Sequence, residues 1–235
     1  MRTRIIVCGH GTTSHAGRTA LSRLVNAVRK QAHGYEVVDA FVDVQHPLLP
    51  DVVAETPGPR VIVPLLLGHD EVSASLLADV VRSDARIRVA PSVGPDWVLA
   101  EIGVRRLIEA GARPSDTIVL VAPRVDGPRA LEDVSSAARL LSAVWGGPVH
   151  VGVVEGEGTP VDQALDVARA HSRRVVVALY DLVSGEGVAR IGRLGADVVT
   201  APLLGAEAPD PQLVSLALAR AVADPSLQGV RGVGP

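Results

Sequence analysis

The stretch Ile5–Thr13 reads Ile-Ile-Val-Cys-Gly-His-Gly-Thr-Thr, and it sets the interpretation of the whole chain. A short aliphatic run ends abruptly at His10, between two glycines, and apolar residues at helical spacing follow over 20–28. A buried strand followed by a helix is typical of α/β proteins. Because ligands bind at the carboxyl ends of strands in such folds, His10 is placed for metal or proton chemistry.

The same alternation of aliphatic runs and amphipathic segments continues along the chain. The runs predicted to be strands are 4–9, 36–43, 60–67, 87–90, 117–122, 149–155, 174–180 and 197–201. Ser14 is expected to cap the first helix between them. This order predicts parallel sheets flanked by helices. Aromatic residues make up only 2% of the chain, which agrees with buried parallel strands built from Val, Ile and Leu.

The second half of the sequence echoes the first. Residues 5–7 match 118–120, and residues 60–63 match 174–177, at a nearly constant offset of about 110 residues. The matches occur in the same order in both halves. We therefore predict one α/β unit that has been duplicated.

The limits of the two units follow from glycine and proline. These residues break the helical pattern around 111–114, and they recur in the tail. The predicted division is an N-terminal unit at 1–113, a C-terminal unit at 114–224 and a flexible tail at 225–235.

Composition limits the class of function. The 235 residues carry a net charge of −3, which argues against a nucleic-acid-binding protein. Cys8 is the single cysteine, so no internal disulfide can form, and a reducing, cytoplasmic location is expected. No run approaches the ~20 apolar residues of a membrane helix, so no membrane contact is expected. The glycines around His10 fit neither a dinucleotide fingerprint nor a phosphate loop.

Three predicted strand ends bring reactive side chains to one edge of the first sheet. They carry His10, Asp43 and the cluster His69-Asp70-Glu71. Because the carboxyl ends of parallel strands share one edge, an imidazole, a carboxylate and a second imidazole or carboxylate face one crevice. Such a set can bind a divalent first-row metal and can move protons near neutral pH.

Each of these residues also has a purely structural interpretation. His10 could be a hydrogen-bonded loop residue, and Asp43 could cap a helix beginning near Pro47. The cluster at 69–71 could be a solvated helix start, where acidic residues are favoured. Cys8 is interpreted as a small buried hydrophobic residue. The other histidines are interpreted as surface or structural residues: His15, His33, His46, His150 and His171.

These motifs resemble those of the sirohydrochlorin chelatases of the CbiX/SirB type, in their long two-repeat bacterial form. The resemblance rests on residues 6–11, on 38–43 with Pro47, and on 61–67. It implies a chelatase-like fold of two similar α/β units with the active cleft between them. The implied activity is that of a lyase, which inserts cobalt or iron into the tetrapyrrole sirohydrochlorin in cobalamin or siroheme biosynthesis.

The resemblance also implies roles for single residues. His10 corresponds to the family's first metal-handling histidine, and Asp43, in place of the usual glutamate, to its partner base. The family's second histidine aligns with Val72 without a gap, and with Glu71 after a shift of one residue, while His69 lies just upstream. The implied catalytic residues are His10 and Asp43, and the implied metal ligands are His10, His69 and Glu71.

Substrate contacts follow from the carboxylates of sirohydrochlorin, which call for arginine near the cleft. Arg124, at the end of the fifth predicted strand, is the first candidate and Arg18 the second. Thr12 and Thr13, which replace the family's usual Ser-Arg, are also assigned to substrate binding. Pro123 occupies the counterpart of His10, so the second unit is expected to lack a site of its own.

The expected metal, Co²⁺ or Fe²⁺, is a substrate, and no permanently bound cofactor is expected. A monomer is expected, because the duplication lets one chain build a complete cleft. Two alternatives stay open. The altered second ligand motif fits a non-catalytic paralogue that binds tetrapyrrole or metal without turnover. The third interpretation is a small-molecule-binding α/β protein unrelated to tetrapyrroles.

Overall fold

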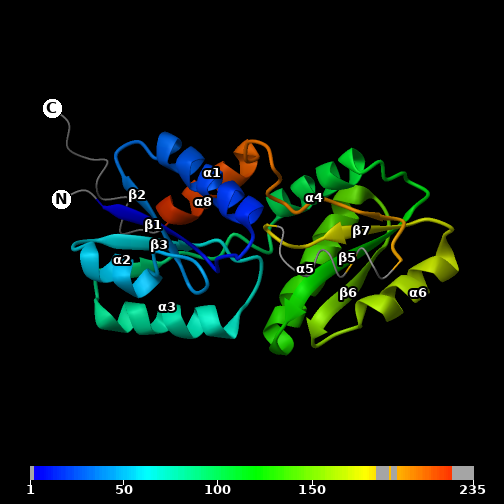
Figure 1. The fold of residues 1–235 in the computed structure, drawn as a ribbon, viewed down its shortest axis with the longest axis horizontal. Coiled ribbons are helices and arrows are strands. Elements are labelled where there is room, and N and C mark those ends of the chain that lie inside the picture. The colour runs from blue at the N-terminus through cyan, green and yellow to red at the C-terminus, as the bar shows by residue number, and fades with distance from the viewer. Residues whose placement is uncertain (1–2, 184–190, 192–194, 224–235) are drawn as a thin grey trace.

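Two parallel sheets of the same strand order form the centre of the protein (Figure 1). The computed structural model describes residues 3–183, 191 and 195–223. The first sheet has the order β2-β1-β3-β4, with strands β1 (Arg4–Gly9), β2 (Glu36–Phe41), β3 (Arg60–Pro64) and β4 (Ile87–Val89). The second has the equivalent order β6-β5-β7-β8, with strands β5 (Thr117–Val125), β6 (Val149–Gly156), β7 (Val175–Leu179) and β8 (Val198–Val199). The predicted α/β class is confirmed; the predicted tail at 225–235 lies outside the described residues.

Helices cover both faces of each sheet. They are α1 (His15–Gln31), α2 (Leu49–Glu55), α3 (Glu71–Ser83), α4 (Trp97–Glu109), α5 (Gly127–Trp145), α6 (Val161–His171) and α8 (Pro211–Val222). The start of α1 confirms the predicted cap, because Ser14 Oγ accepts a hydrogen bond from the Gly17 N–H at 3.2 Å. None of the helices in the described part of the chain is long and apolar enough to cross a membrane.

The predicted strands all form. Some of them end at other residues than predicted, because their pairing with a neighbouring strand stops earlier or later. β3 ends at Pro64 rather than at Leu67, because the chain leaves the sheet there towards α3. β5 continues through Pro123 to Val125, beyond the predicted end at Ala122. Past Val121 this strand pairs with β6 alone, and a proline is tolerated at such an edge.

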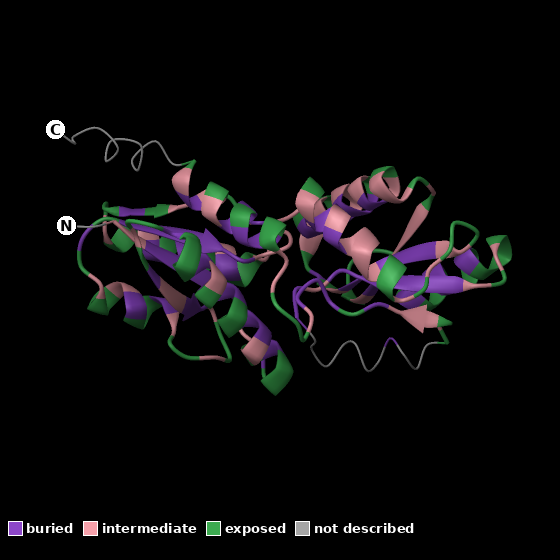
Figure 2. Ribbon diagram, turned by 90° about the horizontal axis from the view of Figure 1, so that it is seen from above, coloured by how far each residue is buried: buried purple, intermediate pink, exposed green. Residues whose placement is uncertain are grey.

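Alternate side chains of each strand point into different apolar layers, as the two-residue period of a strand requires. In β1, Ile5 and Val7 pack under α1 and α8, whereas Ile6 and Cys8 pack against α2 and α3. The first of these layers continues into the second unit and forms one shared core. Figure 2 shows the buried stretches of the ribbon in both units.

Two helices are exchanged between the units. α4 follows the first sheet in sequence but packs against α5 and β7 of the second. α8 comes from the end of the second half, yet it packs against α1 and β3 of the first (Figure 1). The predicted division after residue 113 falls between α4 and β5, and it stays a prediction as a folding boundary.

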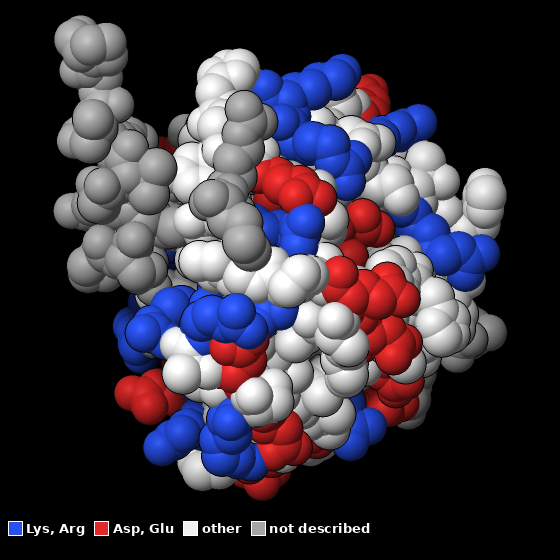
Figure 3. Space-filling model, turned by 90° about the vertical axis from the view of Figure 1, so that its left-hand side faces the viewer, with Lys and Arg blue, Asp and Glu red and all other residues white. Residues whose placement is uncertain are grey.

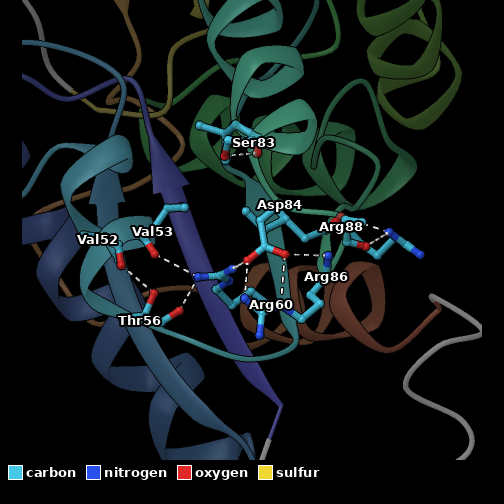
Figure 4. Close-up of polar contacts among 11 residues, drawn as sticks. Val52, Val53, Thr56, Arg60, Ser83, Asp84, Arg86 and Arg88 are labelled. Atoms are coloured by element: carbon cyan, nitrogen blue, oxygen red, sulfur yellow. Dashed lines mark hydrogen bonds and ion pairs between the residues drawn. The ribbon is translucent and has the colours of Figure 1, made fainter.

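The amino-terminal edge of the first sheet is closed by a buried arginine (Figure 4). Arg60 is 3% exposed, donates to the carbonyl oxygens of Val53 (2.8 Å) and Thr56, and pairs with Asp84. Hydrogen bonds from Arg86 hold the pKa of Asp84 well below its ordinary value. These contacts hold the carbonyl groups of this edge, while Arg60 Nε is buried without a hydrogen-bond partner in the described part of the chain.

Acidic and basic side chains are interspersed over the face of the molecule seen in Figure 3. That face therefore presents no continuous basic surface of the kind that nucleic acids bind.

Candidate functional site

The carboxyl edges of the two sheets meet at the segment that follows β3. Tyr180, just after β7, donates its hydroxyl hydrogen to the carbonyl oxygen of Leu67 at 2.7 Å. The backbone N–H of His69 donates to Asp133 Oδ2 on α5 at 2.6 Å. The loop between β3 and α3, Leu65–Asp70, therefore lies against the second unit. We call it the β3–α3 loop.

His10 stands at the carboxyl end of β1 as predicted, and its side chain is 51% exposed. Its carbonyl oxygen accepts from the Asp43 N–H at 3.1 Å, which joins the segments after β1 and β2. Gly11 has φ +99°, and a Cβ there would lie 2.4 Å from the Asp43 carbonyl oxygen. Only glycine fits this approach, which explains the residue that follows His10.

The ring of His10 faces Asp70. Its Nδ1 lies 3.9 Å from Asp70 Oδ2, and the Asp70 side chain is 30% exposed. The same oxygen accepts from the Ser73 N–H at 2.9 Å and caps α3. The helix-start interpretation is thus confirmed for Asp70, and it does not exclude a functional role, since one carboxylate makes both contacts.

The predicted ligands His69 and Glu71 contact each other. His69 Nε2 lies 3.0 Å from Glu71 Oε2, with side chains that are 22% and 82% exposed. In the described part of the chain, no group of three or more His, Cys, Asp or Glu side chains is arranged to hold a metal ion. The structure therefore gives two pairs, one with His10 and one with His69, and the three-ligand set stays a prediction.

Asp43 is exposed next to His10 and is held by its own turn. Its Oδ1 accepts from the Val44 N–H at 2.7 Å. The interpretation of Asp43 as a helix cap is wrong, because α2 begins only at Leu49 and its N-cap, Leu48, makes no side-chain cap hydrogen bond. Within the part of the chain that the structure describes, its other oxygen accepts no hydrogen bond.

The predicted substrate-binding threonines lie in the turn before α1. Thr12 is 8% exposed, and its Oγ1 accepts from the Ser14 N–H at 3.2 Å. Thr13 is exposed, and its carbonyl oxygen accepts from Arg18 at 2.8 Å. Arg18 is thereby bound to this turn, which leaves it less available for a substrate carboxylate.

Arg124 lies at the carboxyl edge of the second sheet, with its side chain 67% exposed. Its Nε donates to Asp126 Oδ2 at 2.5 Å, and its Nη1 lies 3.9 Å from Glu155. The hydrogen bond to Asp126 raises the pKa of Arg124, and the charges of Glu155 and of Asp70 raise it further. Asp70 belongs to the first unit, so its charge acts on Arg124 across the two units.

Three residues of this region were not predicted: Asp133, Tyr180 and Asp181. Burial raises the pKa of Asp181 to about 6, and hydrogen bonds from the backbone of Val183 and Leu182 counteract it in part. The rule that selected His10, a titratable residue directly after an aliphatic strand, also selects Asp181. The same rule selects Tyr180, which follows β7 directly, whereas Asp133, inside α5, left no such signal.

The geometry thus agrees with the family resemblance at the first sheet, where His10, Gly11 and Asp43 lie together. Residues 4–110 match the CbiX family model. This range holds the whole first sheet and α4, and it is somewhat under half of the chain. A comparison with curated protein sequences gave no match.

Solved structures match over nearly the whole length. SirB from Bacillus subtilis with Fe³⁺ has 16% sequence identity and a TM-score of 0.75, with 98% of each chain covered. SirB from Bacillus subtilis subspecies spizizenii in complex with cobalt has 16% identity and a TM-score of 0.73, with 97% of this chain and 98% of that chain covered. CbiX from denitrifying bacteria has 17% identity and a TM-score of 0.67, with coverages of 95% and 99%. At these identities the likeness shows the fold, and the predicted chelatase-like arrangement is confirmed.

Proposed function

We propose that this protein is a sirohydrochlorin chelatase, which inserts Co²⁺ or Fe²⁺ into sirohydrochlorin for cobalamin or siroheme biosynthesis. The observation that carries the proposal is the half-exposed imidazole of His10 beside Asp70, at the carboxyl edge of the first sheet. The family match over residues 4–110 supports it. Two proteins of the same fold hold iron or cobalt, which adds further support.

The reaction exchanges one metal ion for two protons. The ion loses bound water as it enters the ring, and two pyrrole N–H groups lose their protons. His10, when neutral, can hold the ion through a ring nitrogen or accept one of these protons. Asp43 is the proposed partner base, because its carboxylate is exposed in the segment hydrogen-bonded to His10.

The metal is proposed to be held by His10 together with His69 and Glu71. His69 and Glu71 already contact each other at 3.0 Å, so metal binding would replace their mutual contact with bonds to the ion. Imidazole and carboxylate are ligands that suit both candidate metals. Selection between cobalt and iron would then depend on metal supply.

The carboxylates of sirohydrochlorin are proposed to bind Arg124, with Thr12 and Thr13 as further contacts. Asp126 already accepts from Arg124, so a substrate carboxylate has to compete with it for the guanidinium group. We also propose that the enzyme is a cytoplasmic monomer of the lyase class, without a resident cofactor.

Turnover with purified protein tests this function. Sirohydrochlorin absorbance is followed after addition of Co²⁺ or Fe²⁺, with and without the protein. We expect insertion faster than the spontaneous reaction, and we expect His10→Ala to abolish the gain. His33→Ala is the matched control, because His33 is exposed at the other end of the first sheet. Equal rates for the wild type and the spontaneous reaction would reject the chelatase.

One observation favours the second candidate, a paralogue that binds without turnover. In the described residues, no three potential ligands are gathered for a metal, and Val72 occupies the aligned position of the second histidine. Such a protein would give a single stoichiometric absorbance change, with no continued conversion of excess substrate.

A further inference from the structure

The second unit holds the loop that carries the reactive residues of the first. Two hydrogen bonds connect them. The hydroxyl of Tyr180 donates to the Leu67 carbonyl oxygen at 2.7 Å, and the His69 N–H donates to Asp133 Oδ2 at 2.6 Å. Both acceptors and donors on the loop are main-chain groups, so these bonds fix the path of the backbone itself.

Close packing on both sides prevents this loop from sliding. A Cβ on Gly68 would lie 3.0 Å from the Asp133 Cβ, and a Cβ on Gly94 would lie 2.5 Å from the Leu67 carbonyl oxygen. The Gly94 N–H also donates to the Leu66 carbonyl oxygen at 2.9 Å. The β3–α3 loop is therefore closely packed between the segment after β4 and helix α5.

Tyr180 is suited to a permanent donor role. Its side chain is buried, with 8% exposure of the residue. Burial raises its pKa above the ordinary value, and the nearby carboxylates of Asp133 and Asp96 raise it further. The hydroxyl therefore keeps its proton throughout the neutral range and continues to donate to Leu67.

The last residue of this loop contacts His10. The residue after His69 is Asp70, whose Oδ2 lies 3.9 Å from His10 Nδ1. We propose that Asp133 and Tyr180 are positioning residues, through which the second unit fixes the β3–α3 loop and thereby sets Asp70 and His69 relative to His10. This proposal rests on the chelatase function for its effect on rate, and on the loop geometry for its effect on structure.

The hydrogen bond, rather than the charge of Asp133, carries this role. An asparagine at 133 can still accept from the His69 N–H through its amide oxygen, whereas alanine cannot. Asp133→Asn and Asp133→Ala therefore separate the two explanations. Tyr180→Phe removes the second bond and leaves the ring in place. Arg105→Ala is the matched control, because Arg105 pairs with Asp210 elsewhere between the units.

The experiment measures kcat and KM for Co²⁺ insertion into sirohydrochlorin, together with the thermal midpoint of each variant. We expect Asp133→Ala to lower kcat by about 10- to 100-fold, since displacements near 1 Å have effects of this size. KM and the fold are expected to change little. Asp133→Asn is expected to retain most of the activity, Tyr180→Phe to lie between the two, and Arg105→Ala to match the wild type.

Hydrogen–deuterium exchange gives a second measurement that needs no activity. The His69 N–H is hydrogen-bonded to Asp133, so we expect it to be protected from exchange in the wild type. We expect the peptide over 66–71 to exchange faster in Asp133→Ala and at the wild-type rate in Asp133→Asn. Unchanged exchange and unchanged kcat in Asp133→Ala would overturn the proposal, as would equal losses in the alanine and asparagine variants. An inactive wild type with the expected exchange pattern would reject the chelatase function and keep the loop role.

Discussion

The two sheets have the same strand order and similar amino-terminal edges, but their carboxyl edges have diverged. Arg60 at the start of β3 pairs with Asp84, and the matching Arg174 pairs with Asp116 at 2.5 Å. At the opposite edge, β1 ends at Gly9 and is followed by His10, whereas its counterpart β5 continues through Pro123. A buried or half-buried arginine thus closes the amino-terminal edge in both units, although its carboxylate partner comes from a different position in each, and the carboxyl edges differ. The first unit carries His10, and the second unit makes the hydrogen bonds that hold the β3–α3 loop.

The largest expected effect concerns this division of roles. His10→Ala is expected to slow insertion by about 100-fold or more, the range for loss of a positioned acid–base group. Pro123→His is expected to leave the rate nearly unchanged, since the guanidinium beside it is already bound to Asp126. Initial rates from sirohydrochlorin absorbance measure both. Recovery of activity in the double variant would show that the two edges are equivalent.

The next effect tests the edges that the units share. Arg60→Met leaves the Val53 and Thr56 carbonyl oxygens without a donor, and it is expected to lower the free energy of unfolding by about 2–4 kcal/mol. Arg174→Met is expected to lower the free energy of unfolding by less, because the Arg174 side chain is 32% exposed and Asp116 still accepts a hydrogen bond from the Arg113 N–H. Urea unfolding measures both. A larger loss in Arg174→Met would contradict the ranking.

The pH dependence of Asp181 is smaller and belongs to the second unit alone. Its folded pKa of about 6 lies above the ordinary value of 3.8, so the folded protein binds the proton more tightly than the unfolded chain. Its ionisation therefore lowers stability as the pH rises from about 4 to 6. At pH 7, Asp181→Asn is expected to be more stable than the wild type by about 1–3 kcal/mol. The difference should vanish near pH 3.5 in unfolding curves, and a constant difference would exclude titration of this carboxyl.

The smallest effect concerns the guanidinium group of Arg124. Arg124→Gln is expected to raise KM for sirohydrochlorin by about 3- to 10-fold with kcat unchanged, because it removes a charge-assisted contact. Arg129→Gln, an exposed change in the first turn of α5, is the control. Steady-state kinetics at varied sirohydrochlorin concentration give KM and kcat separately for each variant. A fall in kcat without a change in KM would place Arg124 nearer the reacting centre.

Much of the fold could be predicted from the sequence, because aliphatic runs form the strands and the Ser14 cap sets the start of α1 through local contacts. The ends of β3 and β5 could not, since they depend on where a neighbouring strand stops. At the site, His10 and the 69–71 cluster followed from the parallel sheet. The pairing of His10 with Asp70 rather than with His69 depends on side-chain directions in the loop.

The contacts of Asp133 and Tyr180 were beyond sequence reasoning for a different reason. Their partners are the His69 N–H and the Leu67 carbonyl oxygen, which every ordinary residue possesses. Such bonds leave no pattern of residue types. They also depend on how two units dock, and the exchange of α4 and α8 that sets this docking was not predicted either.

The exchange of α8 has a consequence for biosynthesis. The face of β3 that α8 covers is completed by Leu213 and Val214, which are 0% and 1% exposed and are translated after both sheets. While the ribosome makes the second half, this apolar face of the first sheet stays exposed to solvent. Exposed apolar surface of this kind is what chaperones bind, so we expect the nascent first half to interact with them. The unit that carries His10 is completed only after α8 has been synthesised.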